Sequence, residues 1–160
     1  MKHKIEPATL DDLPQLADLL GELFALEPYF TPDRAKQLRG LRLIIERPEA
    51  GCILVVREGP KILGMVNLLY TVSTAEGGPA ILMEDFIVRA EHRGGGLGTQ
   101  LLEHALQLAR ARGATRITLL TDGNNAGGIR FYQRHGFMLS SMVPMRLHLE
   151  ADQPPVKKRT

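Results

Sequence analysis

The chain has 160 residues, of which 44% are hydrophobic and 24% are charged, a balance that suits one globular domain with a sizeable core. Its formal net charge of +2 argues against a nucleic-acid or anionic-membrane partner recruited by bulk electrostatics. The single cysteine, Cys52, excludes an internal disulfide framework and a multi-cysteine zinc site, and it fits a reducing cytoplasm. No apolar stretch is long enough to span a bilayer, so we predict a cytoplasmic protein without a membrane partner.

Alternating strand-like and helix-like patterns divide the chain into short elements. The expected strands, rich in β-branched and apolar residues, are residues 2–6, 52–57, 62–72, 80–89, 115–121, 138–141 and 142–149. Apolar residues at helical spacing, together with helix-start and helix-breaking residues, predict helices over about residues 13–26, 32–47 and 97–112. A further short helix is expected after Asn125, on the grounds given below. The order is therefore strand, helix, helix, three strands, helix, strand, helix and two strands. This order predicts a mixed α+β fold.

A glycine-rich loop follows the apolar strand end Phe86-Ile87-Val88. Four of the six residues from Arg93 to Gly98 are glycine, and an amphipathic helix begins directly after them. A strand that leads through such a loop into a helix directs several backbone N–H groups and the positive end of the helix dipole at one spot. The pattern predicts an anion site, most simply for a phosphate.

The spacing of the glycines selects among phosphate-binding motifs. No lysine follows the loop, which excludes a Walker motif, and Gly-x-Gly-x-x-Gly fails because Thr99 or Leu101 occupies its last position. The pattern that fits is Arg-x-x-Gly-x-Gly, formed by Arg93, Gly96 and Gly98. It resembles the acetyl-CoA pyrophosphate loop of the GNAT superfamily of N-acetyltransferases.

A second motif strengthens this resemblance. From Asn125, the chain continues to Phe131-Tyr132 and Gly136-Phe137, which is similar to the family's short helix opened by Asn and closed by Phe-Tyr-x-x-x-Gly-Phe. Gly128 departs from the pattern, since the family usually has Ala there, and this weakens the helix by roughly 1 kcal/mol. The resemblance is specific over residues 84–137.

The resemblance implies a GNAT fold over residues 2–150. It consists of a mixed, mostly antiparallel twisted sheet of about seven strands, flanked by about four helices. Residues 151–160 form a basic tail that we expect to be disordered. The family also implies a homodimer as one assembly.

The implied coenzyme site combines a strand edge with the loop. The amides of the loop can hold the pyrophosphate, and the edge of the strand can pair with the pantetheine arm as an added strand would. Asn125 can cap its helix, bind the pantetheine arm, or both. The expected acetyl-CoA-binding residues are Phe86, Ile87, Val88, Arg93, Gly94, Gly95, Gly96, Leu97, Gly98, Thr99, Asn125 and Tyr132.

Acyl transfer to an amine needs a base for the amine and a proton donor for the leaving thiolate. By resemblance, Tyr132 is that donor. Glu84 is the preferred base, because a carboxylate inside an apolar strand marks function and the Glu-Asp-Phe piece is similar to polyamine acetyltransferases. Asp85 is the alternative, since a β-bulge here would exchange the two faces. A water chain, or no dedicated base at all, is a further alternative.

The acceptor is the least determined part of the hypothesis. The resemblance places it near residues 26–33 and 73–79, where Tyr29 and Phe30, with Glu84, are the candidate substrate residues. A primary amine of a small molecule is the expected acceptor, and a protein amine is an alternative. No His, Asp or Glu cluster has metal-ligand spacing, so no metal is expected. The rival function is an acyl-CoA-binding sensor with little catalysis.

Overall fold

The computed structural model describes residues 2–27 and 31–149. The chain divides into two compact units, Met1–Leu120 and Thr121–Thr160. The first unit contains every strand of the described chain and three of its α-helices, whereas the second contains one helix and an irregular segment. No helix of the described residues has the length and apolar character needed to cross a membrane.

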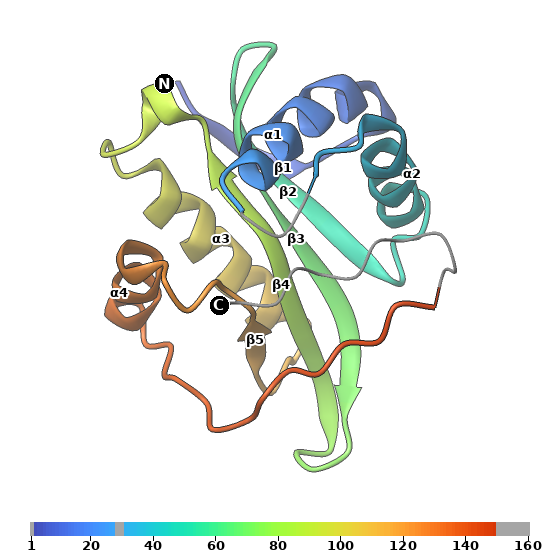
Figure 1. The fold of residues 1–160 in the computed structure, drawn as a ribbon, viewed down its shortest axis with the longest axis vertical. Coiled ribbons are helices and arrows are strands. Elements are labelled where there is room, and N and C mark those ends of the chain that lie inside the picture. The colour runs from blue at the N-terminus through green and yellow to red at the C-terminus, as the bar shows by residue number, and fades with distance from the viewer. Residues whose placement is uncertain (1, 28–30, 150–160) are drawn as a thin grey trace. The chain divides into compact units, whose positions relative to one another are not determined.

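A five-stranded sheet forms the centre of the first unit (Figure 1), and its strands lie in the order of the chain. The strands are β1 (Lys4–Pro7), β2 (Gly51–Glu58), β3 (Lys61–Ser73), β4 (Gly78–Val88) and β5 (Ile117–Leu119). The first four pair in antiparallel fashion, and β5 pairs with β4 in parallel. This mixed sheet agrees with the predicted fold class.

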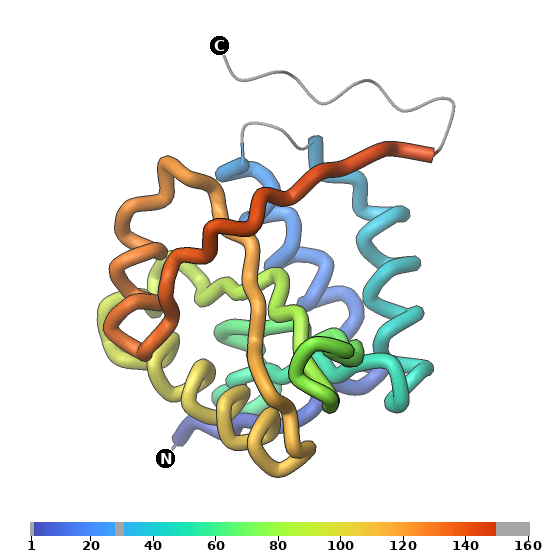
Figure 2. The backbone as a smooth tube through the Cα atoms, turned by 90° about the horizontal axis from the view of Figure 1, so that it is seen from below, coloured from blue at the N-terminus to red at the C-terminus, as the bar shows by residue number. Residues whose placement is uncertain are grey.

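Helices cover both faces of the sheet. They are α1 (Leu13–Ala25), α2 (Arg34–Ile45) and α3 (Leu97–Ala111), and Figure 2 shows α1 and α2 on one side of the strands and α3 on the other. Side chains alternate along a strand, so Ile53 and Val55 of β2 join the core under α1 and α2. Both faces of most of β2 and of residues 62–68 of β3 are buried, which is why these segments read as nearly continuous apolar runs.

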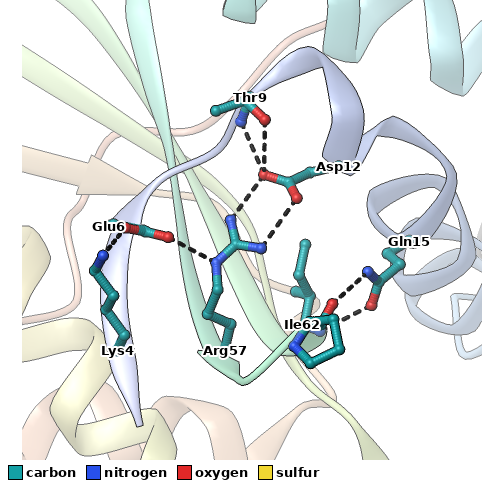
Figure 3. Close-up of polar contacts among 8 residues, drawn as sticks. Lys4, Glu6, Thr9, Asp12, Gln15, Arg57 and Ile62 are labelled. Atoms are coloured by element: carbon teal, nitrogen blue, oxygen red, sulfur yellow. Dashed lines mark hydrogen bonds and ion pairs between the residues drawn. The ribbon is translucent and has the colours of Figure 1, made fainter.

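A buried ionic cluster ties the N-terminal strand to the sheet and to the first helix (Figure 3). Both terminal nitrogens of Arg57 on β2 donate to the carboxylate of Asp12, at 3.1 and 2.8 Å. Its Nε lies 2.8 Å from Oε1 of Glu6 on β1. Asp12 Oδ2 also accepts from the backbone N–H of Thr9 at 2.8 Å, where the chain turns into α1. One guanidinium thus holds three parts of the fold together.

The second unit differs from the prediction. Its helix α4 (Ala126–Arg134) is where the motif places it, but residues 138–149 form no strand, so two of the seven expected strands are absent from the described chain. A strand forms only where a neighbouring strand pairs with its backbone N–H and C=O groups. Residue composition alone does not show whether such a neighbour is present. Pro144 also removes one backbone donor from this segment. The expected strand at residues 115–121 is likewise shorter, as β5 has 3 residues.

Candidate functional site

The edge of β4 is only partly paired. On one side, β4 pairs with β3 up to Val88. On the other side, its ladder with β5 ends at the pair Met83–Leu119. Residues 84–88 of β4 therefore have one strand neighbour among the described strands, and their outer backbone groups form an edge to which an extended ligand can add as a strand.

A β-bulge distorts β4 at the start of this edge. Met65 on β3 pairs with Ile87, and Asn67 pairs with Glu84, so Val66 lies opposite both Asp85 and Phe86. Asp85 has a φ angle of +53° and is the one non-glycine residue with positive φ in the described chain. Because such backbone is rarely adopted by a residue with a side chain, it is a marker of a strained, often functional position.

The bulge brings Asp85 against a buried amide that the sequence analysis did not single out. Asn67 lies on β3, its side chain is 3% exposed, and its Nδ2 donates to Asp85 Oδ2 at 2.6 Å. The signal in the sequence is a single asparagine inside the apolar run of residues 62–72. A polar group there is unfavourable unless it has a partner.

The electrostatic surroundings of Asp85 make it a weak acid. Burial, followed by the negative charge of Glu84, raises the pKa of Asp85 to about 6, and the hydrogen bond from Asn67 opposes this rise. A smaller contribution comes from Glu27, just after α1. Such a carboxylate is mostly ionised at neutral pH and is basic enough to accept a proton. Glu84 itself is half-buried.

The glycine loop forms a cradle at the start of α3. Gly94 and Gly96 have φ angles of +85° and +89°, and a Cβ atom at either position would meet no atom within 4 Å, so the loop borders open space. The helix's first hydrogen bond runs from Gln100 N to Gly96 O, which leaves the N–H groups of residues 97–99 without a partner within the helix. The first turn carries no acidic residue. Free N–H groups at a helix N-terminus without a nearby acidic residue can bind an anion such as a phosphate.

Arg93 is fixed to the strand rather than extended over the loop. Its Nε donates to the backbone carbonyl oxygen of Val88 at 2.8 Å. The contact links the end of β4 to the beginning of the cradle. Of the strand-end residues themselves, Ile87 and Val88 have buried side chains, so they can meet a ligand only through their backbone.

In the second unit, Asn125 caps α4. Its Oδ1 accepts from Gly128 N at 3.1 Å, and its Nδ2 donates to Thr121 Oγ1 at 3.1 Å. This confirms the capping interpretation and explains the departure at Gly128, because a Cβ there would overlap the Asn125 side chain. The glycine lowers helix propensity but allows a tight cap.

Tyr132 lies on α4 among aromatic neighbours. Its ring packs edge-on against Phe131 and Phe137, with centroids 5.3 and 5.7 Å apart. Burial raises the pKa of Tyr132 to about 12. The phenol therefore keeps its proton at neutral pH and can serve as a hydrogen-bond donor but not as a base. The other two aromatic candidates, Tyr29 and Phe30, lie outside the described residues.

A separate hollow lies at the opposite end of β4 from the glycine loop. Its lining includes Tyr70, Ile81 and Arg112, and the Arg112 guanidinium stacks 3.5 Å above the Tyr70 ring. None of the predicted site residues lines it. The strand edge, the bulge and the cradle, all on the other half of β4, remain the candidate site of the first unit.

Comparison with known proteins identifies the family. A model of the acetyltransferase (GNAT) family matches residues 14–137, which is most of the chain. The chain belongs to this family. The match includes the bulged strand, the glycine cradle and α4, and it crosses the boundary between the two compact units.

Individual relatives agree with this assignment. An uncharacterized N-acetyltransferase of Methanocaldococcus jannaschii is 24% identical over 88% of this GNAT chain and 63% of its own length. An L-methionine sulfoximine/L-methionine sulfone acetyltransferase of Pseudomonas aeruginosa is 35% identical over 43% of this chain and 40% of its own length. The chain thus spans less than two thirds of these relatives.

Solved structures show the same architecture. An integron cassette protein from the mobile metagenome of Cole Harbour Salt Marsh superposes with a TM-score of 0.78. It is 26% identical, and the match covers 95% of this chain and 92% of that one. The sheet with helices on both faces is therefore an arrangement that other chains of this size adopt.

Proposed function

We propose that this chain transfers an acetyl group from acetyl-CoA to a primary amine of a small molecule, by direct attack of the amine in a ternary complex. The observation that carries the proposal is a succession of two features: beyond Met83, β4 has β3 as its one strand neighbour among the described strands, and it then leads into a glycine cradle at the N-terminus of a 15-residue helix. An amide-rich arm that ends in a diphosphate matches both parts. The family match supports the same reaction.

We assign coenzyme binding mainly to backbone groups. We assign the diphosphate to the N–H groups of residues 94–99 and the pantetheine arm to the outer edge of residues 86–88. Arg93 supports the cradle through its contact with Val88, and Asn125, whose capping bonds order α4, is a second contact of the arm. When bound, the coenzyme supplies an activated acetyl thioester, whose carbon–sulfur bond breaks as the carbon–nitrogen bond forms.

We assign the base to Asp85 ahead of Glu84. Two properties favour Asp85: its strained backbone and a pKa of about 6. An amine with a pKa near 10 is mostly protonated at neutral pH, so a nearby carboxylate of raised basicity assists the loss of its proton. We assign to Tyr132 the hydrogen bond that stabilises the leaving sulfur, since its phenol stays protonated.

The small-molecule acceptor is supported by the Pseudomonas relative, which is named for small amino-acid derivatives. We further propose that residues 2–150 work as one acetyltransferase domain, because the family match continues across residues 120 and 121.

An amine screen tests the proposed function. The chain is incubated with acetyl-CoA and a broad panel of primary amines, and the free thiol and the acetylated amine are both quantified. We expect equal amounts of thiol and amide with at least one small amine. Tight binding of acetyl-CoA with no acetylated product from any amine would favour the sensor function instead.

A further inference from the structure

The Asn67 side chain holds an oxygen for which the described chain provides no donor. Its neighbours Met65, Val66 and Leu68 are all 0% exposed, so the amide sits in a dry part of β3. Nδ2 is engaged with Asp85, whereas Oδ1 is buried and has no hydrogen-bond partner among the described residues. A buried carbonyl oxygen without a hydrogen-bond donor is unfavourable, and native structures contain few of them.

Negative charges act on the Asp85 carboxylate, to which this amide donates. Glu84 is adjacent to Asp85 in sequence and is the Cα partner of Asn67 across the sheet. Glu84, and to a smaller extent Glu27, both act on Asp85 as negative charges. The site therefore favours a group that brings both a positive charge and N–H donors.

The geometry points to an ammonium subsite formed by Asn67 and Asp85, in which Asn67 Oδ1 accepts one N–H of the acceptor amine and the Asp85 carboxylate accepts another. This inference rests on the proposed function and deepens it, because it names the acceptor's binding form and class. A metal ion is the competing occupant. Within the part of the chain described by the structure, no group of three or more His, Cys, Asp or Glu side chains is arranged to hold one.

The subsite also selects the rest of the acceptor. A carboxylate a few bonds from the amine would lie in the negative field of Glu84 and Glu27, whereas a second ammonium group would be attracted. The preferred class is thus an alkylamine whose far end is cationic or neutral, rather than an amino acid. Three four-carbon amines differ only in that end: butane-1,4-diamine, butylamine and 4-aminobutyrate.

The first experiment uses the wild-type chain and needs no catalysis. Binding of the three amines is measured by calorimetry at pH 7.5 with coenzyme A present. We expect the diamine to bind most tightly and 4-aminobutyrate to bind at least tenfold more weakly than the diamine. Equal affinities, or tighter binding of 4-aminobutyrate, would overturn the inference.

The second experiment removes the amide. In Asn67→Leu, we expect a tenfold or greater loss of diamine affinity and, in turnover, an increase in KM for the amine that exceeds the decrease in kcat. Gln37→Leu is the matched control: Gln37, on α2, is also a buried amide with an unpartnered nitrogen among the described residues, and its replacement should leave both quantities unchanged. Unchanged diamine affinity in folded Asn67→Leu would refute the subsite.

The two proposals fail in distinguishable ways. If no amine is acetylated but the affinity order and the effect of Asn67→Leu hold, the ammonium subsite stands and the proposed transfer reaction is wrong. If amines are acetylated but 4-aminobutyrate is as good a ligand as the diamine, the reaction stands and the subsite is wrong. The wild-type affinity order decides the inference even where Asn67→Leu does not fold.

Discussion

Two adjacent carboxylates on β4 illustrate how much one extra residue changes. Without a bulge, Glu84 and Asp85 would point to opposite faces of the sheet. The bulge opposite Val66 instead places Asp85 in a left-handed backbone conformation and against Asn67. Burial and the charge of Glu84 then raise its pKa to about 6. At this scale, the site is defined by strain and by a buried negative charge.

Replacing Asp85 should separate stability from activity. The carboxyl group has a pKa of about 6 in the folded chain against an ordinary value of 3.8, so the fold prefers its protonated form. The ionisation of Asp85 therefore lowers the free energy of unfolding as the pH rises from about 4 to 6. We expect Asp85→Asn to increase the free energy of unfolding by about 1–3 kcal/mol at pH 7.5, with little gain at pH 4. Urea titrations at the two pH values measure this.

The same variant tests the chemistry. Asp85→Asn should lower kcat/KM by roughly 100-fold or more at neutral pH, and the wild type should lose activity below about pH 6 as the base becomes protonated. Glu84→Gln, one residue away, is the control and should retain more activity. A larger loss in Glu84→Gln than in Asp85→Asn would transfer the role of base to Glu84.

Tyr132 allows a comparison that isolates one hydroxyl group. Tyr132→Phe keeps the ring and its contacts with Phe131 and Phe137 but removes the phenolic hydroxyl group. We therefore expect kcat to fall about 10- to 100-fold, with little change in acetyl-CoA affinity. Tyr70→Phe, on β3, is the control. The rate of thiol release gives kcat, and calorimetry gives the affinity for acetyl-CoA. An unchanged kcat would exclude the phenol from the reaction.

At the scale of elements, the proposed function depends on the point where β4 loses β5 as a neighbour and on the point where α3 starts. β4 loses its β5 neighbour after Met83, and the chain then passes through the cradle into α3. Each element is ordinary in isolation. Their succession places a strand edge beside a group of helix-terminal amides, and we assign the pantetheine arm to the first and the diphosphate to the second.

A matched pair of glycines tests the cradle. Gly96, before α3, and Gly113, after it, have φ angles of +89° and +72°, and a Cβ atom at either position would meet no atom within 4 Å. Alanine at either position should therefore destabilise the fold by about 1–2 kcal/mol through backbone strain alone. Only Gly96→Ala should also weaken coenzyme A binding, by about tenfold or more. Similar affinities in the two variants would argue against the cradle as the diphosphate site.

At the scale of the whole molecule, the partly buried cation of Arg57 connects several parts of the described chain. Arg57 connects β1, β2 and the start of α1, and its side chain is 16% exposed, against 8% for Asp12. Burial of Asp12 opposes its ionisation, but the hydrogen bonds from Arg57 and Thr9, together with the charge of Arg57, outweigh this and hold the pKa of Asp12 below its ordinary value. The carboxylate thus contributes stability at neutral pH that is lost as the pH falls.

Removing this cation should weaken the fold in a pH-dependent way. We expect Arg57→Leu to reduce the free energy of unfolding by about 3 kcal/mol at pH 7, because Asp12 then remains buried without a counter-charge. The loss should shrink at pH 3, where Asp12 can be protonated. Arg42→Leu breaks the exposed pair with Glu46 and should change stability by less than about 0.5 kcal/mol. Thermal unfolding of both variants at both pH values provides the comparison.

The local sequence was sufficient for much of the fold. Helix-start residues, breakers and the helical spacing of apolar residues located α1, α2 and α3, and the resemblance of residues 125–137 to the family motif located α4. The glycine pattern with Arg93 placed the cradle between β4 and α3. Asn125 was correctly interpreted as a cap. These features depend on backbone propensities and on contacts within a few residues, which the order of residues determines directly.

Tertiary structure alone decided the rest. Residues 138–149 have strand-like composition but no pairing partner among the described residues, and the bulge that orients Asp85 arises from the register between β3 and β4. Asn67 and Asp85 are 18 residues apart, so nothing local to either residue reveals that one donates a hydrogen bond to the other. Pairing, register and burial join distant parts of the chain, and they settle which of several plausible polar residues share a site.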